Sequence, residues 1–130
     1  MTDHLDLLHS DTEEELRSAV RALLADRSAP AAVLARAESG AGHDPALWRT
    51  LARDIGTAGL LVPEKLGGQG ASHREAAVVL EELGRAVAHL PYLTSAVVAT
   101  EALLACPGPA AAALLHDLAA GDTVCATALP

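Results

Sequence analysis

The segment after Ser72 carries the strongest helical pattern in the chain and most constrains how it can fold. Ser72 and Glu75 form an S-x-x-E capping box, in which each side chain bonds a backbone N–H group at the start of a helix. Glu81 and Arg85 lie four residues apart and are predicted to form an ion pair on the outer face. Apolar residues recur at the spacing of one helix face at Ala76, Val79, Leu80, Leu83, Val87 and Leu90. An amphipathic helix of this kind must bury that face against other elements.

Start and stop signals predict further helices on both sides of this one. Thr12 and Glu15 form a second capping box, proline marks several first helical positions, and glycine follows several helix ends. The predicted helices run from Thr12 to about Arg27, from Pro30 to Gly40, from Pro45 to Gly56, and from about Ala110 to Ala119. The stretch between Thr57 and Ala71 holds one proline and four glycines and is predicted to be a structured loop.

The segment from Pro91 to Ala105 has apolar or small residues on every face except around Glu101. This pattern is typical of a helix buried between others or beneath a partner. The chain then ends in DTVCATALP, which favours a short β-strand for which no other part of the sequence offers a sheet. We therefore predict an all-α fold, an irregular bundle of about six helices followed by a short C-terminal β segment.

Composition agrees with one helical domain and excludes some partners. The 130 residues suffice for a single core, and the only aromatic residues are Trp48 and Tyr92. The net charge of −8 argues against nucleic acid or an anionic membrane as main partner. No apolar stretch is long enough to span a bilayer, and the N-terminus does not resemble a signal peptide. With only two cysteines, Cys106 and Cys125, the sequence predicts a cytoplasmic protein.

Gly67-Gly68-Gln69-Gly70 is the most prominent glycine cluster. Successive backbone N–H groups there could cradle a phosphate ahead of the helix at Ser72. Neither GxGxxG nor GxxxxGK[ST] is present, however, and no βαβ strand precedes the cluster. A tight turn with positive φ angles is the favoured interpretation.

No combination of residues predicts an active site or a metal site. The six histidines are scattered, and no two lie three or four positions apart. The hydroxyls of Thr94, Ser95 and Thr100 are expected to bond back to the preceding helical turn. Glu101 is a candidate general base if it is buried, although a lone glutamate on such a helix more often marks the solvated side.

One run does resemble a known family: LWRTLARDIGTAGLLVPEKLGGQGASHREAAVVLEELGRA, residues 47–86. It is similar to the N-terminal helical domain of acyl-CoA dehydrogenases, which has an LW helix start, a GL-x-x-P-E-x-x-GG-x-G loop and an EEL helix. Here these motifs are Leu47-Trp48, then Gly59-Leu60 through Gly70, then Glu81-Glu82-Leu83. The resemblance extends more weakly from about Leu16 to Pro130.

The resemblance implies a role in the oxidation of acyl-CoA thioesters to 2-enoyl-CoA with FAD as cofactor. In the family a glutamate base and most of the flavin site belong to a middle β domain and a C-terminal helical bundle. On this basis residues 1–121 are the helical domain, and residues 122–130 begin a middle domain that is otherwise absent. No residue of this chain is assigned to catalysis.

Family positions carry over to two groups of residues. The helix after EEL lines the acyl pocket in the family, which implies substrate contacts for Pro91, Tyr92, Ser95 and Ala99. The family's first middle-domain strand lies beside the flavin, which implies cofactor contacts for Cys125, Thr127 and Ala128. Ala128 and Leu129 replace the threonine and glutamate of the family's T-E-P triplet. This departure is either a subfamily variation or the mark of a subunit with a degenerate flavin site.

The sequence therefore predicts the substrate-pocket domain of an FAD-dependent acyl-CoA dehydrogenase. It is expected to work with acyl-CoA and with the missing domains or a partner subunit, in a homo- or hetero-oligomer. The alternatives are a non-catalytic partner subunit of a heteromeric dehydrogenase and a free-standing helical interaction module. The isolated chain is predicted to be inactive and to retain no FAD.

Overall fold

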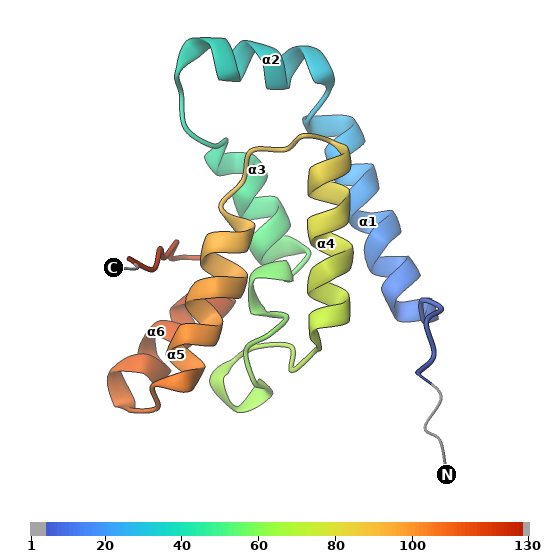
Figure 1. Ribbon diagram of the computed structural model, residues 1–130. Helices are drawn as coiled ribbons and strands as arrows, with labels where there is room; N and C mark the ends of the chain where they lie inside the picture. Colours follow the sequence, from blue (N-terminus) through green and yellow to red (C-terminus); the bar gives the residue numbers. More distant parts are fainter. Residues whose placement is uncertain (1–4, 129–130) are drawn as a thin grey trace.

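The computed structural model describes residues 5–128 and is a bundle of α-helices (Figure 1). The helices are α1 (Asp11–Arg27), α2 (Pro30–Ser39), α3 (Pro45–Arg49), α4 (His73–Arg85), α5 (Thr100–Ala105) and α6 (Pro109–Ala120). π-Helical turns continue α3 as η1 (Thr50–Asp54) and lead into α5 as η4 (Tyr92–Ala99). Two short 3₁₀ turns, η2 (Thr57–Gly59) and η3 (Glu64–Leu66), lie in the loop between η1 and α4. The predicted all-α fold with about six helices is confirmed.

The predicted C-terminal β segment is wrong for the part of it that the structure describes. Residues 123–128 contain no strand, and none occurs elsewhere between residues 5 and 128. The segment extends away from α6 with no neighbouring strand to pair with, so its β-leaning composition has no ladder to join. Leu129 and Pro130, the end of the predicted strand, lie outside the described residues.

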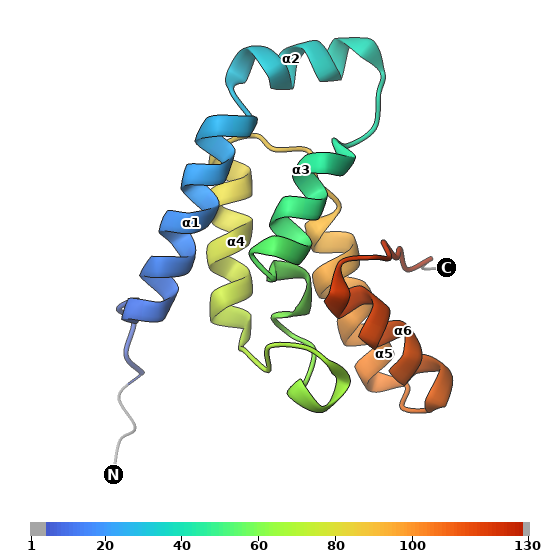
Figure 2. The ribbon, with the colours of Figure 1, turned by 180° about the vertical axis from the view of Figure 1, so that it is seen from behind.

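Helices α1 and α4 lie side by side and run in the same direction (Figures 1 and 2). The capping box of α1 is Ser10 with Glu13, two residues before the predicted pair of Thr12 and Glu15. Ser10 Oγ accepts a hydrogen bond from the Glu13 N–H at 3.1 Å, and Glu13 Oε2 accepts one from the Ser10 N–H at 2.9 Å. Glu13 is favoured because its carboxylate also binds Arg74 on α4.

Helix α4 begins at the predicted capping box but ends earlier than the apolar spacing suggested. A Schellman turn closes it, with the Val87 N–H bonded to the Gly84 carbonyl and the Ala88 N–H to the Leu83 carbonyl. Val87 occupies the left-handed position of this turn, with φ at 51°, and 70% of it is exposed. Val87 is thus not on the buried face as predicted, because the helix stops before reaching it.

The core lies between α1, α3, α4 and η4. Its fully buried members include Val20, Leu51, Val79 and Tyr92, with Trp48 almost completely covered. On α6, Leu115 and Leu118 are buried as predicted, whereas Leu114 is only half-buried. The core thus holds η4 against α1, α3 and α4, and α6 packs on α5 and on the turns η1 and η2.

Helix α2 differs from the other long helices because none of its residues is buried. It forms an arch across one end of the bundle, joined to α1 by two residues and to α3 by a short glycine-containing loop (Figures 1 and 2). Its exposed side chains include Leu34, which is 59% exposed. Two hollows lie against it, and they are described below.

Candidate functional site

The glycine cluster forms the predicted tight turn and cannot serve as a phosphate cradle. The N–H groups of Gly67 to Ala71 all donate to carbonyls of the loop itself, at 2.7 to 3.1 Å. Gly67 and Gly70 have positive φ angles of 88° and 59°. A Cβ atom on Gly68 would overlap the carbonyl group of Val62. These backbone N–H groups are therefore unavailable to a phosphate, because their hydrogen bonds hold the loop together. The loop packs the GL-x-x-P-E-x-x-GG-x-G sequence under α4.

The predicted substrate residues lie on η4 or, for Pro91, directly before it, and most of them face the interior of this chain. Tyr92, Ser95 and Ala99 are each at most 4% exposed, whereas Pro91 is half-buried. The Tyr92 hydroxyl donates to the Thr57 carbonyl oxygen at 3.3 Å. Burial raises the pKa of this hydroxyl above its ordinary value. These three residues thus fix the position of η4 against the loop that follows η1.

One hydrogen bond joins the two groups of predicted site residues. The backbone N–H of Cys125 donates to Ser95 Oγ at 3.0 Å. Ser95 comes from the middle of η4, and Cys125 from the segment that leaves α6. The bond therefore sets where the chain runs after α6 relative to the helix that the family resemblance assigns to the acyl pocket.

The other hydroxyls and the lone acid of this helix behave as their ordinary chemistry predicts. Thr94 and Thr100 bond back to carbonyls of the preceding turn, those of Pro91 and Ser95. Glu101 is 46% exposed and pairs with His73 of α4, with Oε1 and Nε2 2.9 Å apart. Glu101 is thus a solvated residue that joins α5 to the start of α4. This is the second of the two interpretations that the sequence offered, and it is not the buried position that a general base would need.

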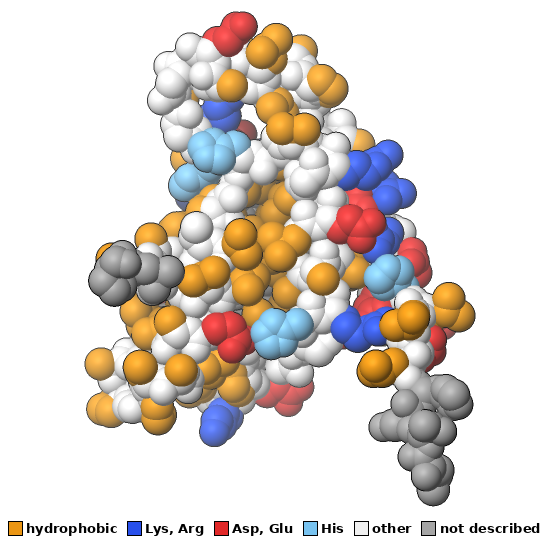
Figure 3. Space-filling model, viewed as in Figure 1, with side chains coloured by type: hydrophobic (Ala, Val, Ile, Leu, Met, Phe, Trp, Pro, Cys, Tyr) orange, Lys and Arg blue, Asp and Glu red, His pale blue; other side chains and the backbone are white. Residues whose placement is uncertain are grey.

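An apolar surface lies between α4 and the continuous helix η4–α5 (Figure 3). Among the apolar residues of these two elements, Leu80 of α4 and Val97 of η4 are half-buried and pack on the core. Leu93 of η4 is 51% exposed. We call these three residues the α4/η4 apolar face. The predicted helix that is apolar all round thus buries one side in this chain and leaves another side open.

The motif residue Glu82 is buried and fully engaged in binding two arginines of α1. Its side chain is 1% exposed, and it lies 2.7 to 2.9 Å from the guanidinium nitrogens of Arg17 and Arg21. Those partners, with Arg21 making the largest contribution, lower the pKa of Glu82 to about 2. Glu81 pairs with Arg17 at 3.1 Å, so the predicted pair of Glu81 with Arg85 is wrong.

Sequence reasoning missed the structural role of this glutamate, although a signal was present. Arg17 and Arg21 lie four apart on α1 and therefore share one face, which is otherwise bordered by the apolar Val20 and Leu24. Two arginines at the edge of a buried helix face indicate an acidic residue on the neighbouring helix, because a charge that is removed from solvent needs a partner.

The residues assigned to the flavin lie on the open segment after α6. Cys125 is half-buried, and Thr127 and Ala128 are exposed. Neither the Thr127 hydroxyl nor the backbone of residues 126–128 makes a hydrogen bond within residues 5–128. The segment thus leaves these donors and acceptors unpaired within the described residues.

Over residues 5–128, no group of three or more histidine, cysteine, aspartate or glutamate side chains is placed to bind a metal ion. In the same part of the chain, no helix is both long and apolar enough to cross a membrane.

Comparisons with known proteins agree with the resemblance. The family model described as acyl-CoA dehydrogenase, N-terminal domain, matches residues 10–122. The acyl-CoA dehydrogenase IpdE2 of Mycobacterium tuberculosis is 42% identical over 119 residues, which cover 92% of this chain and 37% of that protein. The protein of the same name from Mycolicibacterium smegmatis is 48% identical over 84 residues, covering 65% of this chain and 27% of the relative.

A solved structure shows the same fold. A chain in the crystal structure of the ChsE4–ChsE5 complex from Mycobacterium tuberculosis matches with a TM-score of 0.78 and 28% identity. The match covers 92% of this chain and 33% of that one. This chain thus spans only about a third of the length of the proteins it matches. The family match over residues 10–122 establishes that the chain belongs to the acyl-CoA dehydrogenase family, as its N-terminal helical domain.

Proposed function

We propose that the chain is the N-terminal substrate-pocket domain of an FAD-dependent acyl-CoA dehydrogenase, which converts acyl-CoA thioesters to 2-enoyl-CoA. Residues 1–121 form the helical domain, and residues 122–130 begin the middle β domain. The observation that carries this proposal is the α4/η4 apolar face, an open hydrophobic surface on a chain of this family. An acyl chain needs such a surface on at least one side of its pocket.

In this proposal the four predicted substrate residues shape the wall of the acyl pocket. Tyr92, Ser95 and Ala99 hold η4 against the core, and Pro91 begins the helix at its half-buried end. With them in place, Leu93 and Val97 lie on the more open side of η4. The small side chains of Ser95 and Ala99 let η4 pack deeply, which leaves room on the outer side for wide acyl groups.

The predicted flavin residues supply one edge of the cofactor site. Thr127 and Ala128 offer unpaired backbone groups and one hydroxyl, and Cys125 offers its carbonyl, on the segment that Ser95 holds through the Cys125 N–H. Bound FAD would supply the oxidant for the removal of hydrogen from the α- and β-carbons of the substrate. The catalytic base and the rest of the cofactor site come from the missing domains or from a partner subunit. The free thiols of Cys106 and Cys125 fit a protein that works in the reducing cytoplasm.

A second candidate function is that of a non-catalytic subunit that completes another chain's acyl site. The matched chain from the ChsE4–ChsE5 complex favours this candidate, because that protein is part of a heteromeric assembly. Ala128 in place of the family's threonine points the same way, because it removes a hydroxyl from the flavin edge. In either case we expect a homo- or hetero-oligomer.

The proposal is tested by placing a charge on the α4/η4 apolar face of the enzyme that carries the chain. Leu93→Asp should lower kcat/KM for octanoyl-CoA by at least about tenfold, because a carboxylate would have to be desolvated beside the acyl chain. Glu14→Gln on the exposed side of α1 is the control and should leave kcat/KM unchanged. Equal kcat/KM for the wild-type protein and Leu93→Asp would show that this face does not line the acyl site.

A further inference from the structure

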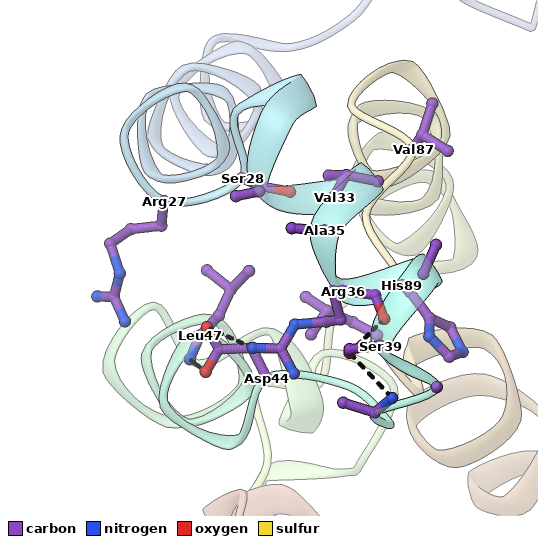
Figure 4. Close-up of a pocket in the computed structure, with 15 residues that line it drawn as sticks. Arg27, Ser28, Val33, Ala35, Arg36, Ser39, Asp44, Leu47, Val87 and His89 are labelled. Carbon is purple, nitrogen blue, oxygen red and sulfur yellow. Dashed lines mark hydrogen bonds and ion pairs between the residues drawn. The ribbon is translucent and has the colours of Figure 1, made fainter.

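A hollow beneath α2 is a feature of the described residues that the dehydrogenase proposal does not use. Its volume is about 790 Å³, and it is enclosed by α2, the end of α1, the start of α3 and the segment after α4 (Figure 4). A second hollow of about 490 Å³ lies between α2, α1 and the end of α4, and it shares Ser28, Val33, Ala37 and Val87 with the first. The first volume is within the range typical of small-molecule sites, roughly 300–1,000 Å³.

The inner surface of the larger hollow is mainly apolar. Val33 of α2 faces Leu47 of α3 across it, and Val87 and Leu90 line it from the segment after α4. Val87 lines both hollows, is 70% exposed and is the only described non-glycine residue with a positive φ angle. The lining is thus suited to an aliphatic group.

The polar groups of the hollow favour an anion. Arg27 at the end of α1 lies on one side and His89 on the other (Figure 4). Arg36 is already engaged, because it donates to the Gly42 carbonyl at 3.0 Å and lies 3.7 Å from Asp44. Arg27 makes no hydrogen bond or ion pair with any side chain in residues 5–128. Arg27 is exposed, and Asp44 is the carboxylate in the lining, so two guanidinium groups share one acidic partner in the hollow.

We propose that the hollow beneath α2 binds an aliphatic carboxylate, whose chain packs on Val33, Leu47 and Leu90 and whose carboxylate pairs with Arg27. Guanidinium groups bind carboxylates through two parallel hydrogen bonds, and the apolar floor covers a hydrocarbon chain. Helix α2 can cover such a ligand, because none of its residues is buried in the core. This site is separate from the α4/η4 apolar face.

Sodium decanoate is a suitable probe, and Trp48 is a built-in reporter of its binding. Trp48 is the only tryptophan in the chain and adjoins Leu47 in the wall of the hollow. Titration of the purified protein with decanoate, below its micelle threshold, should change the Trp48 fluorescence in a saturable way and give a matching binding isotherm by calorimetry. Decanol, which lacks the charge, should bind at least about tenfold more weakly.

Three variants decide whether the site is the one described. Arg27→Ala should weaken decanoate binding about tenfold, whereas Arg49→Ala, which removes an exposed arginine that does not line the hollow, should leave it unchanged. Val33→Phe should abolish binding by filling the cavity. All three positions lie outside the buried core, so circular dichroism should show unchanged helix content.

The proposal is overturned if decanoate does not bind. It is equally overturned if Arg27→Ala and Val33→Phe bind decanoate as well as the wild-type protein does, or if decanol binds as tightly as decanoate. The last result would show only adsorption to apolar surface. Because binding is measured without turnover, these outcomes are independent of whether the dehydrogenase proposal holds.

Discussion

Arg21 of α1 and Glu82 of α4, 61 residues apart in the sequence, form a bidentate ion pair between the two helices. Arg21 Nη2 lies 2.7 Å from Glu82 Oε1, and Arg21 Nε lies 2.9 Å from Glu82 Oε2. Arg17 donates to the same Oε1 at 2.9 Å. The second glutamate of the EEL motif is therefore a structural residue that fixes α1 beside α4, and through α4 the wall formed with η4.

Replacing Glu82 should destabilise the fold strongly. Glu82→Gln leaves two arginines facing a neutral amide in a buried position, and we expect the free energy of unfolding to fall by about 2–3 kcal/mol. Glu81→Gln is the matched control, because the Glu81 side chain is 63% exposed, and its cost should stay below about 1 kcal/mol. Urea denaturation measures both values. Equal losses of unfolding free energy in the two variants would mean that burial of the Glu82 ion pair does not increase its contribution to stability.

Stability should fall in acid over a defined range of pH. Arg74 and the Ser10 N–H hold the pKa of Glu13 at about 2, and the arginines of α1 hold the pKa of Glu82 at about 2, against 4.5 for an unperturbed glutamate. Lowered pKa values stabilise the folded state above pH 4.5, and this contribution is lost as the pH falls from 4.5 towards 2.

The urea midpoint should therefore drop steeply across that range. A Glu13→Gln, Glu82→Gln double variant should show a shallower drop, because two of the groups that take up protons on unfolding are gone. If the double variant keeps the full pH dependence, other carboxylates must cause it.

Two glycines should respond in opposite ways to alanine. Gly68→Ala should lower the free energy of unfolding by about 2–3 kcal/mol, because its Cβ atom would overlap the Val62 carbonyl group. Gly84→Ala should raise it by about 0.5–1 kcal/mol, because Gly84 lies in α4 with open space around it. Thermal unfolding of both variants measures the two effects, and a neutral Gly68→Ala would contradict the described loop.

Val87→Gly should stabilise the protein. Glycine adopts the left-handed position of the Schellman turn without the steric cost that valine incurs, and little apolar contact is lost because Val87 is exposed. We expect a gain of about 0.5–1 kcal/mol in chemical denaturation. A loss of stability would show that Val87 makes contacts that the structure does not contain.

Ser95→Ala should release the segment after α6. The Cys125 N–H would lose its acceptor, so its amide hydrogen should exchange faster with solvent, and the free energy of unfolding should fall by about 0.5–1.5 kcal/mol. Thr94→Ala on the exposed side of η4 is the control and should leave Cys125 exchange unchanged. Unaltered exchange in Ser95→Ala would mean that the bond does not hold the segment.

The features that the sequence predicts well are those decided by near neighbours. The capping box of Ser72 with Glu75, the Asp44-Pro45 helix start and the tight turn at the glycine cluster all depend on residues within a few positions of one another. The position of the α1 cap differs by two residues because the choice of Glu13 is made by Arg74, which is 61 residues away.

The features that escape prediction depend on contacts distant in the sequence. Because the segment after Pro91 is apolar on nearly every face, its pattern cannot show that Tyr92 points into the core while Leu93 stays open. The π-helical turns of η4 also shift its faces from the usual spacing. The end of α4 before Val87 escapes for a related reason, since valine is an unusual residue for a left-handed helix end.

The central claim is that this chain supports acyl-CoA dehydrogenation only together with the rest of the flavin site. The most direct measurement follows the visible flavin absorbance, after gel filtration and on addition of octanoyl-CoA, for the chain alone and for the chain joined to its missing domains or partner subunit. We predict that the chain alone is colourless and inactive and that the assembled protein holds a flavin that octanoyl-CoA bleaches. A flavin retained and reduced by the chain alone, or an assembled flavoprotein that no acyl-CoA bleaches, would contradict the claim.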